Sequence, residues 1–148
     1  MNRNMQMLLV GNGALVFLAG MLAGFPYASV LVASVDPGAA TMWPGDLRAW
    51  KMAHLEGALN GMLMIAVGAA MAQAAMTARV QSIIVWGLIV TGWGNIIASF
   101  VSAMTGGRGL GFTGADWNTV TFTLFMVAIL GVVAAMIAVA WAAFTSRR

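Results

Sequence analysis

Long apolar stretches and short polar ones alternate along the chain. Four stretches, at about residues 5–25, 47–75, 80–104 and 118–144, consist almost entirely of apolar and small residues. A helix needs about 20 such residues to cross the hydrocarbon core of a bilayer. The pattern therefore predicts an all-α fold, a single four-helix transmembrane bundle that takes up residues 1–148.

Turn-forming residues mark where these helices begin and end. Asp36-Pro37-Gly38 predicts a turn after the first stretch, and Asp46 is placed to cap the second helix. Pro26 predicts an earlier break or kink, although residues 28–35 are apolar enough for the helix to continue or to lie in the interface. The short connection at 77–79 requires the second and third helices to run antiparallel.

Composition supports a membrane protein and narrows its chemistry. Hydrophobic residues make up 61% and charged residues 7% of the chain, with a mean hydropathy of +0.92, whereas soluble domains are about 25% charged. The isoelectric point near 10.7 comes from seven scattered basic residues, so we expect a lipid bilayer and not a nucleic acid as partner. Without cysteine, the chain has no thiolate ligand, disulfide or iron–sulfur cluster.

The distribution of charge predicts the orientation in the membrane. Four spans place both termini on one side, which collects four arginines and no acid: Arg3, Arg79, Arg147 and Arg148. The other side carries the remaining three basic residues and all four acids, with Arg48, Trp50 and Lys51 expected at the interface. By the positive-inside rule we expect a multi-pass protein of the cytoplasmic (inner) membrane with cytoplasmic termini.

His54, the only histidine, lies about two turns into the second helix and is the sharpest functional signal. Ionisable groups within membrane helices are costly, so they are functional candidates by default. One histidine without cysteine is too few ligands for an ordinary protein-only metal site, but a haem needs only one axial side chain. The alternative is a histidine that is hydrogen-bonded inside the bundle.

Helical geometry places other residues relative to His54. At about 100° per residue, Gly57 and Gly61 share its face and leave a flat strip for a planar ring, or for close packing of a neighbouring helix. Asn60 lies about 120° around the helix, on the face of Glu56. A site that uses both His54 and Asn60 would therefore lie between subunits of an obligate oligomer.

The second and third stretches also carry a resemblance to a known family. The residues concerned are Trp50, Ala53-His54, residues 58–62 (Ala-Leu-Asn-Gly-Met), residues 65–67 (Ile-Ala-Val), residues 82–85 (Ser-Ile-Ile-Val), Gly92-Trp93, Asn95 and Arg108-Gly109-Leu110. Over about residues 50–112 the chain resembles the styrene oxide isomerases and the related hydroxylaminobenzene mutases, which share a small four-helix format.

This resemblance implies a homotrimer with haem b between protomers. It implies His54 as the axial ligand of ferric iron, and Asn60 as a residue that holds a small aromatic substrate. Arg108, in the matched Arg-Gly-Leu segment, becomes a candidate for cofactor binding. Asn95, Ser99 and Glu56 are candidates to orient the substrate or shuttle a proton, and interhelical hydrogen bonding is their alternative role.

Two positions depart from the epoxide isomerases. Thr91 stands where those enzymes have an aspartate, and Ser99 where they have a pocket tyrosine. The missing tyrosine, together with the shorter chain, favours the mutase branch, in which ferric iron acts as a Lewis acid and an arylhydroxylamine becomes an ortho-aminophenol. Isomerisation of an aryl epoxide to an aldehyde is the alternative.

Functions of other classes also stay open. A haem electron-transfer subunit usually holds its haem between two histidines, so here two chains would each have to contribute one. A small exporter would use Glu56 as a proton-coupled cation site, unless this carboxylate only forms an interfacial ion pair. A structural membrane protein would need no ligand.

Overall fold

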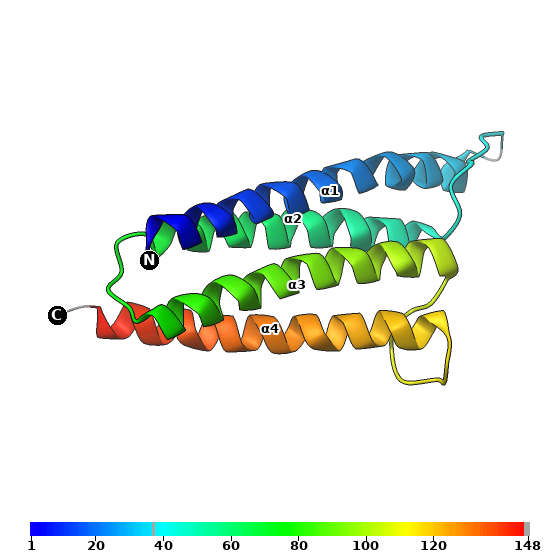
Figure 1. Ribbon diagram of the computed structural model, residues 1–148. Helices are drawn as coiled ribbons and strands as arrows, with labels where there is room; N and C mark the ends of the chain where they lie inside the picture. The colour runs from blue at the N-terminus through cyan, green and yellow to red at the C-terminus, as the bar shows by residue number, and fades with distance from the viewer. Residues whose placement is uncertain (37, 147–148) are drawn as a thin grey trace.

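Four long helices make up the computed structural model, which describes residues 1–36 and 38–146 (Figure 1). They are α1 (Arg3–Val35), α2 (Leu47–Ala70), α3 (Ala78–Thr105) and α4 (Trp117–Thr145), and the described residues include no strand. All four are long and apolar enough to cross a bilayer. The all-α fold predicted from the sequence is therefore confirmed, and the chain is a multi-pass membrane protein.

The helices form two antiparallel hairpins that lie side by side (Figure 1). α1 packs along α2 and α3 packs along α4, while α3 also contacts both α1 and α2. Among the described residues, α4 contacts α3 alone, so it lies at one edge of the bundle. Residues 38–46 and the loop of residues 106–116 lie at the end opposite the N-terminus (Figure 1).

A polar side chain caps the first turn of each helix. Asp46, as predicted, accepts a hydrogen bond from the backbone N–H of Ala49 at 2.7 Å. Asn2, Thr77 and Asp116 do the same for α1, α3 and α4. Each cap satisfies one of the four N–H groups that a helix start leaves without a partner, and so determines where the helix begins.

Two helix ends differ from the prediction. α1 continues ten residues past residue 25 to Val35, with Pro26 buried inside it. A proline removes one intrahelical hydrogen bond, and the apolar residues that follow still favour helix in a membrane. α2 ends at Ala70 and not at 75. The ammonium group of Met1 donates to carbonyls at this end, including that of Met71 at 3.1 Å, so these acceptors have a partner outside the helix.

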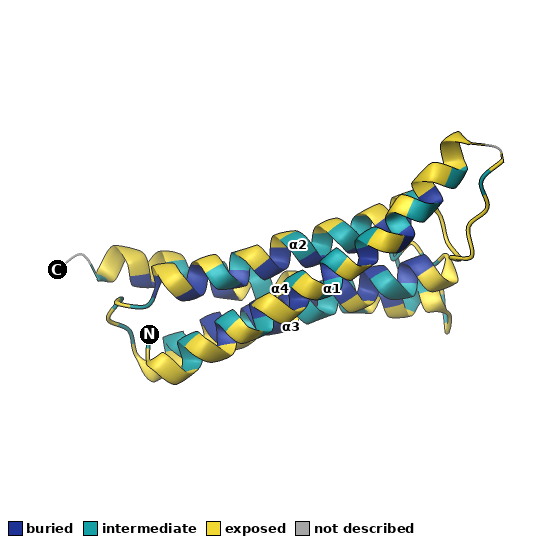
Figure 2. Cartoon of the chain, turned by 90° about the horizontal axis from the view of Figure 1, so that it is seen from above, coloured by how far each residue is buried: buried dark blue, intermediate teal, exposed yellow. Residues whose placement is uncertain are grey.

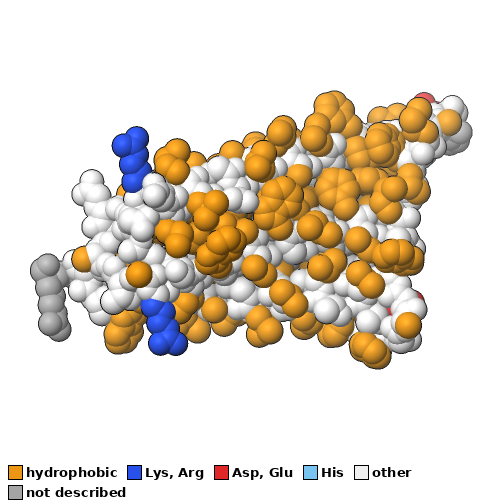
Figure 3. All heavy atoms as spheres, viewed as in Figure 1, with side chains coloured by type: hydrophobic (Ala, Val, Ile, Leu, Met, Phe, Trp, Pro, Cys, Tyr) orange, Lys and Arg blue, Asp and Glu red, His pale blue; other side chains and the backbone are white. Residues whose placement is uncertain are grey.

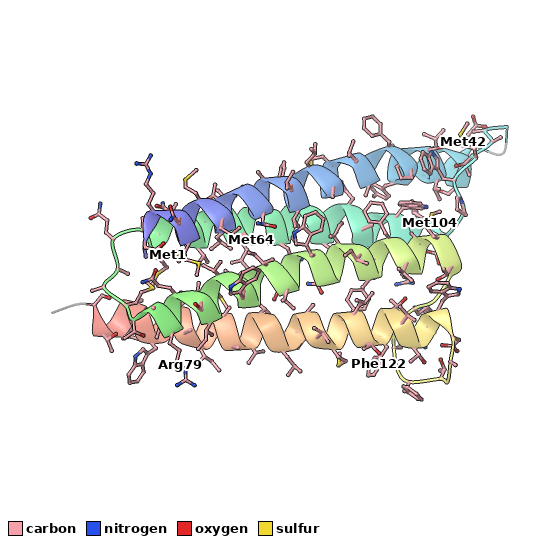
Figure 4. The ribbon with its side chains drawn as sticks, in the orientation of Figure 1. Met1, Met42, Met64, Arg79, Met104 and Phe122 are labelled. Atoms are coloured by element: carbon pink, nitrogen blue, oxygen red, sulfur yellow. The ribbon has the colours of Figure 1, made fainter. Side chains whose placement is uncertain are left out.

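Small residues let the helix backbones approach one another. Gly20 of α1 faces Gly57 of α2, and Gly87 of α3 faces Gly131 of α4. Met64 of α2, which is labelled in Figure 4, lies against Gly92 of α3. Lipid tails are as apolar as leucine, so association of membrane helices depends on such close packing and not on the hydrophobic effect.

The outer surface is apolar along the length of the helices. Buried residues line the inner faces (Figure 2), and exposed hydrophobic side chains cover the face seen in Figure 3. α4 is the least buried of the four helices, since only 11% of its most apolar 18-residue segment is buried. Arg3, the first residue of α1, and Arg79, at the start of α3, lie at the same end of the bundle (Figure 1), as predicted, whereas Arg147 and Arg148 lie outside the described residues.

Candidate functional site at His54

An aromatic cluster holds the start of α2 and therefore the position of His54. The indole of Trp50 is 1% exposed, and its Nε1–H donates to the carbonyl oxygen of Pro44 at 2.6 Å. Trp43 and Phe100 both pack edge-on against it, with ring centroids 5.8 Å away. The indole packs inside the bundle against α3, and its expected depth at the membrane interface stays a prediction. His54 follows one turn later on the helix so fixed.

The imidazole of His54 lies against α1. Its Nδ1 is 2.9 Å from the carbonyl oxygen of Gly20, and its ring is nearly parallel to that of Tyr27, with centroids 6.0 Å apart. A carbonyl oxygen can only accept, so Nδ1 must carry the hydrogen. Nε2 of the neutral ring then keeps its lone pair, and no described residue forms a hydrogen bond with it.

This arrangement fits an axial ligand of a haem. Histidines that bind metals usually donate the other ring N–H to a carbonyl or carboxylate, which fixes the tautomer and the ring orientation. His54 has that bond, and its side chain is only partly buried. A Cβ on Gly24 would come within 3.2 Å of Nδ1, so the glycine leaves room for the imidazole.

The glycine strip beside His54 is not open to a planar ring. A Cβ on Gly57 would collide with the backbone of Gly20, and one on Gly61 would lie 2.7 Å from the carbonyl oxygen of Gly13. The placement of Gly57 and Gly61 as cofactor-binding residues is therefore corrected. They belong to the α1/α2 contact, which is the alternative that their spacing also supported.

Asn60 and Glu56 form a pair on another face of α2. The Nδ2 of Asn60 lies 2.8 Å from the backbone carbonyl oxygen of Glu56 and 2.8 Å from its carboxylate Oε2. Met64, one turn further along this face, contacts Gly92 of α3. The pair therefore lies toward the α3 side of α2, whereas His54 faces α1. Helical geometry predicted that the two faces differ, but not which helix each of them meets.

The polar residues of α3 divide into two groups. Ser99 and Ser102 are fully buried, and neither hydroxyl has a hydrogen-bond partner among the described residues. Ser99 is one turn from Ile96, whose Cδ1 lies against Gly57, so it shares the face that packs on α2. Asn95 is partly buried one turn earlier and also forms no side-chain hydrogen bond with a described residue.

Thr91 belongs instead to the α3/α4 contact. Its Oγ1 is 2.7 Å from the carbonyl oxygen of Gly87 and 2.9 Å from that of Ala128 in α4. The departure from the aspartate of the epoxide isomerases is thus at a position that joins two helices. On α1, Asn12 likewise accepts a bond from the indole N–H of Trp93 at 3.0 Å, a structural interhelical contact.

Arg108 is exposed in the loop of residues 106–116, on the side of α3 that carries α4. Asn118 orders this loop, since its Oδ1 accepts from the N–H of Gly109 and its Nδ2 donates to the carbonyl of Gly111. In the described part of the chain, no acid pairs with Arg108, and the guanidinium is not among the contacts of His54. Its assignment to cofactor binding stays a prediction.

Sequence reasoning missed the α1 side of the site. Gly20, Gly24 and Tyr27 all lie next to His54, and they come from a helix that sequence reasoning did not assign to the site. The four-residue spacing of Gly20 and Gly24 was a usable signal, because it predicts a face of α1 that another helix can approach closely. What it could not show is that this helix is the one bearing the histidine.

The fold and the site define a class: a multi-pass α-helical membrane protein with one imidazole, oriented by a backbone carbonyl within its spans. The chain belongs to the styrene oxide isomerase family, whose family model matches residues 5–144. This membership indicates an isomerase. No curated protein matches the sequence closely enough to count as a relative.

Proposed function

We propose that the chain is a haem-b-dependent membrane isomerase that rearranges a small aromatic substrate without net oxidation or reduction. The observation that carries this proposal is the 2.9 Å contact between Nδ1 of His54 and the Gly20 carbonyl, which leaves Nε2 as a free ligand atom. His54 would hold the haem, and ferric haem would supply Lewis acidity toward an oxygen of the substrate.

The site we propose lies between protomers of a homotrimer. His54 faces α1, whereas Asn60 and Glu56 face the α3 side, so one chain does not turn all three toward one ligand. The hollows at the start of α4 and between α3 and α4 are not lined by His54. A neighbouring protomer would supply the missing wall, and Arg108 remains a candidate to bind the cofactor from its loop.

The favoured reaction converts an arylhydroxylamine to an ortho-aminophenol. The N–O bond breaks and a C–O bond forms at the ortho carbon. That carbon loses its hydrogen as a proton and the nitrogen gains a proton, so the product is an isomer of the substrate. The apolar helix faces would exclude bulk water from the cationic aryl species. Asn60 would hold the substrate, and Ser99 and Asn95 are the candidates to move a proton.

The second candidate is isomerisation of an aryl epoxide to an aldehyde. The family match over residues 5–144 favours it. One argument against epoxide isomerisation was that Thr91 replaces an aspartate. Thr91 bonds to α4 and does not lie beside His54 of the same chain, so this argument is weakened. Ser99 still argues against epoxide isomerisation, because it stands where those enzymes have a tyrosine and its buried hydroxyl has no hydrogen-bond partner among the described residues.

Location in the cytoplasmic membrane with cytoplasmic termini is part of the proposal. Arg3 and Arg79, with no acid near them in the sequence, support this orientation. A haem electron-transfer subunit is the rival from another class, and it would need His54 from each of two chains on one iron.

Visible absorption of the detergent-solubilised protein tests the proposal. We expect a Soret band in the wild type that disappears in His54→Ala, with turnover falling on the order of a thousandfold or more. His54→Gly with added imidazole is the matched control and should regain the band. Absence of the band from wild type prepared with haem would reject the proposal. Phenylhydroxylamine and styrene oxide then distinguish the two isomerases, and an electron carrier would rearrange neither.

A further inference from the structure

The amide of Asn60 has only one orientation that suits its surroundings. Its nitrogen lies 2.8 Å from two atoms of Glu56, the backbone carbonyl oxygen and the carboxylate Oε2. Both of these atoms are acceptors, and the amide nitrogen carries two hydrogens, so each finds its own partner. A rotated amide would place Oδ1 against two other oxygens and lose both hydrogen bonds. Glu56 therefore determines which end of the amide points away from it.

The atom that remains available on Asn60 is Oδ1. It receives no hydrogen bond from any described residue, yet it is not among the enclosed side-chain atoms that lack a partner. Asn60 as a whole is 9% exposed, so this oxygen reaches the surface of the chain at the rim of the α2 face that bears Met64. A ligand at this place meets a hydrogen-bond acceptor and no donor from Asn60.

We infer that Glu56 is a positioning residue and that Asn60, through Oδ1, selects substrates that carry an N–H or O–H donor. This inference rests on the proposed function, and it deepens it by naming the chemistry of the substrate. An arylhydroxylamine has donors on both nitrogen and oxygen, whereas the oxygen of an epoxide can only accept. The pair Glu56–Asn60 thus favours the hydroxylamine, and the direct role of Glu56 in proton transfer is replaced by control of the amide.

Equilibrium binding of phenol and anisole to the detergent-solubilised protein tests the inference without turnover. The two ligands differ in the donor hydrogen, which anisole replaces with a methyl group. The quantity compared is the ratio of their dissociation constants, corrected with protein-free micelles, in each variant relative to wild type. Differences in shape and in micelle partitioning cancel in this comparison.

We expect Asn60→Leu and Glu56→Leu each to reduce the preference for phenol by roughly three- to tenfold, the effect of one neutral hydrogen bond. Glu56→Gln retains an acceptor for Nδ2 and should keep the preference within about twofold of wild type. Trp93→Phe is the matched control, because it removes the hydrogen-bond partner of a different asparagine, Asn12, and should change nothing. The ratio of kcat/KM values for phenylhydroxylamine and styrene oxide should move in the same direction.

The inference is overturned if Glu56→Leu keeps the wild-type preference while folded, or if Asn60→Leu does. Equal loss in Glu56→Gln and Glu56→Leu would also overturn it, because the charge and not the acceptor would then be responsible. Glu56→Met tests the same loss if Glu56→Leu fails to fold. A protein with a Soret band and turnover but no preference for phenol contradicts this inference alone, whereas a missing Soret band contradicts the proposed function.

Discussion

The α1/α2 and α3/α4 hairpins pack by the same means but carry different chemistry. In both, facing glycines bring two backbones together, Gly20 with Gly57 in the first and Gly87 with Gly131 in the second. The polar bond across the first contact joins the His54 imidazole to a carbonyl, and the one across the second joins the Thr91 hydroxyl to a carbonyl. Only the imidazole can bind a metal, so similar packing serves a candidate site in one hairpin and support in the other.

The difference between the hairpins also appears in what surrounds them. α1 and α2 both contact α3, whereas α4 contacts α3 alone among the described elements. His54 therefore lies at the contact between α1 and α2, and both of these helices also pack against α3. This comparison teaches that close backbone approach does not by itself mark a functional contact. The chemistry of a contact depends on the side chain that bonds from one helix to the other, His54 in the first hairpin and Thr91 in the second.

The largest effect is expected when a methyl group is added to each glycine contact. Gly57→Ala would force α1 and α2 apart and should cost about 1–3 kcal/mol of stability, while moving the Gly20 carbonyl away from Nδ1 of His54. Gly131→Ala places its Cβ 2.8 Å from the Gly87 carbonyl oxygen and should cost a similar amount. Thermal denaturation in detergent measures the stability of both variants.

The two variants should differ in their absorption spectra. We expect Gly57→Ala to weaken haem binding and Gly131→Ala to leave the Soret band as in wild type. Gly11→Ala is the control, because no atom lies within 4 Å of its added Cβ and alanine favours helix. Equal spectra of Gly57→Ala and Gly131→Ala would contradict the distinction drawn between the hairpins.

A smaller effect is expected from Thr91→Val, which keeps the shape of the side chain and removes its hydroxyl. The bond to the Ala128 carbonyl across the α3/α4 contact is lost, so stability should fall by about 0.5–1.5 kcal/mol with no change in haem absorption. Thr123→Val removes only a bond to the Thr119 carbonyl within α4 and serves as control. A changed Soret band in Thr91→Val would place this residue in the site after all.

The smallest effect is expected outside the membrane, at the start of α4. The backbone N–H of Thr119, and then the hydroxyl of Thr113, hold the pKa of Asp116 below its ordinary value of 3.8. Because the folded-state pKa is lowered, the cap stabilises α4 fully above about pH 3.8 and is lost as the pH falls through the lower folded value. The protection of the Thr119 amide against hydrogen exchange, relative to the intrinsic rate at each pH, should therefore fall as the carboxylate is protonated.

Asp116→Asn should remove this pH dependence while retaining a cap, since asparagine is also a good N-cap residue. Exposure of the carboxylate to solvent keeps the effect small. Acid-dependent exchange that persists in Asp116→Asn would assign it to another group. The α1/α2 site should be unaffected in this variant.

Much of the fold was predictable from the sequence because membrane spans depend on length and apolar composition alone. The third and fourth helices begin and end within two residues of the predicted bounds. The bounds differ where a local signal met a longer-range effect: α1 continues through Pro26, as the apolar residues 28–35 allowed, and α2 ends just before the carbonyls that the Met1 ammonium binds. The predicted haem, trimer and mutase activity remain predictions.

The sequence by itself determined that the chain spans a membrane four times, that one imidazole lies within a span, and that Asn60 points about 120° away from it. These follow from composition and from the fixed rotation per residue of a helix. Only the tertiary structure decided that α1 covers Gly57 and Gly61, that the Gly20 carbonyl orients His54, and that Thr91 joins α3 to α4. Which helix face meets which neighbour depends on contacts between distant segments, and periodicity along one helix does not specify its partner.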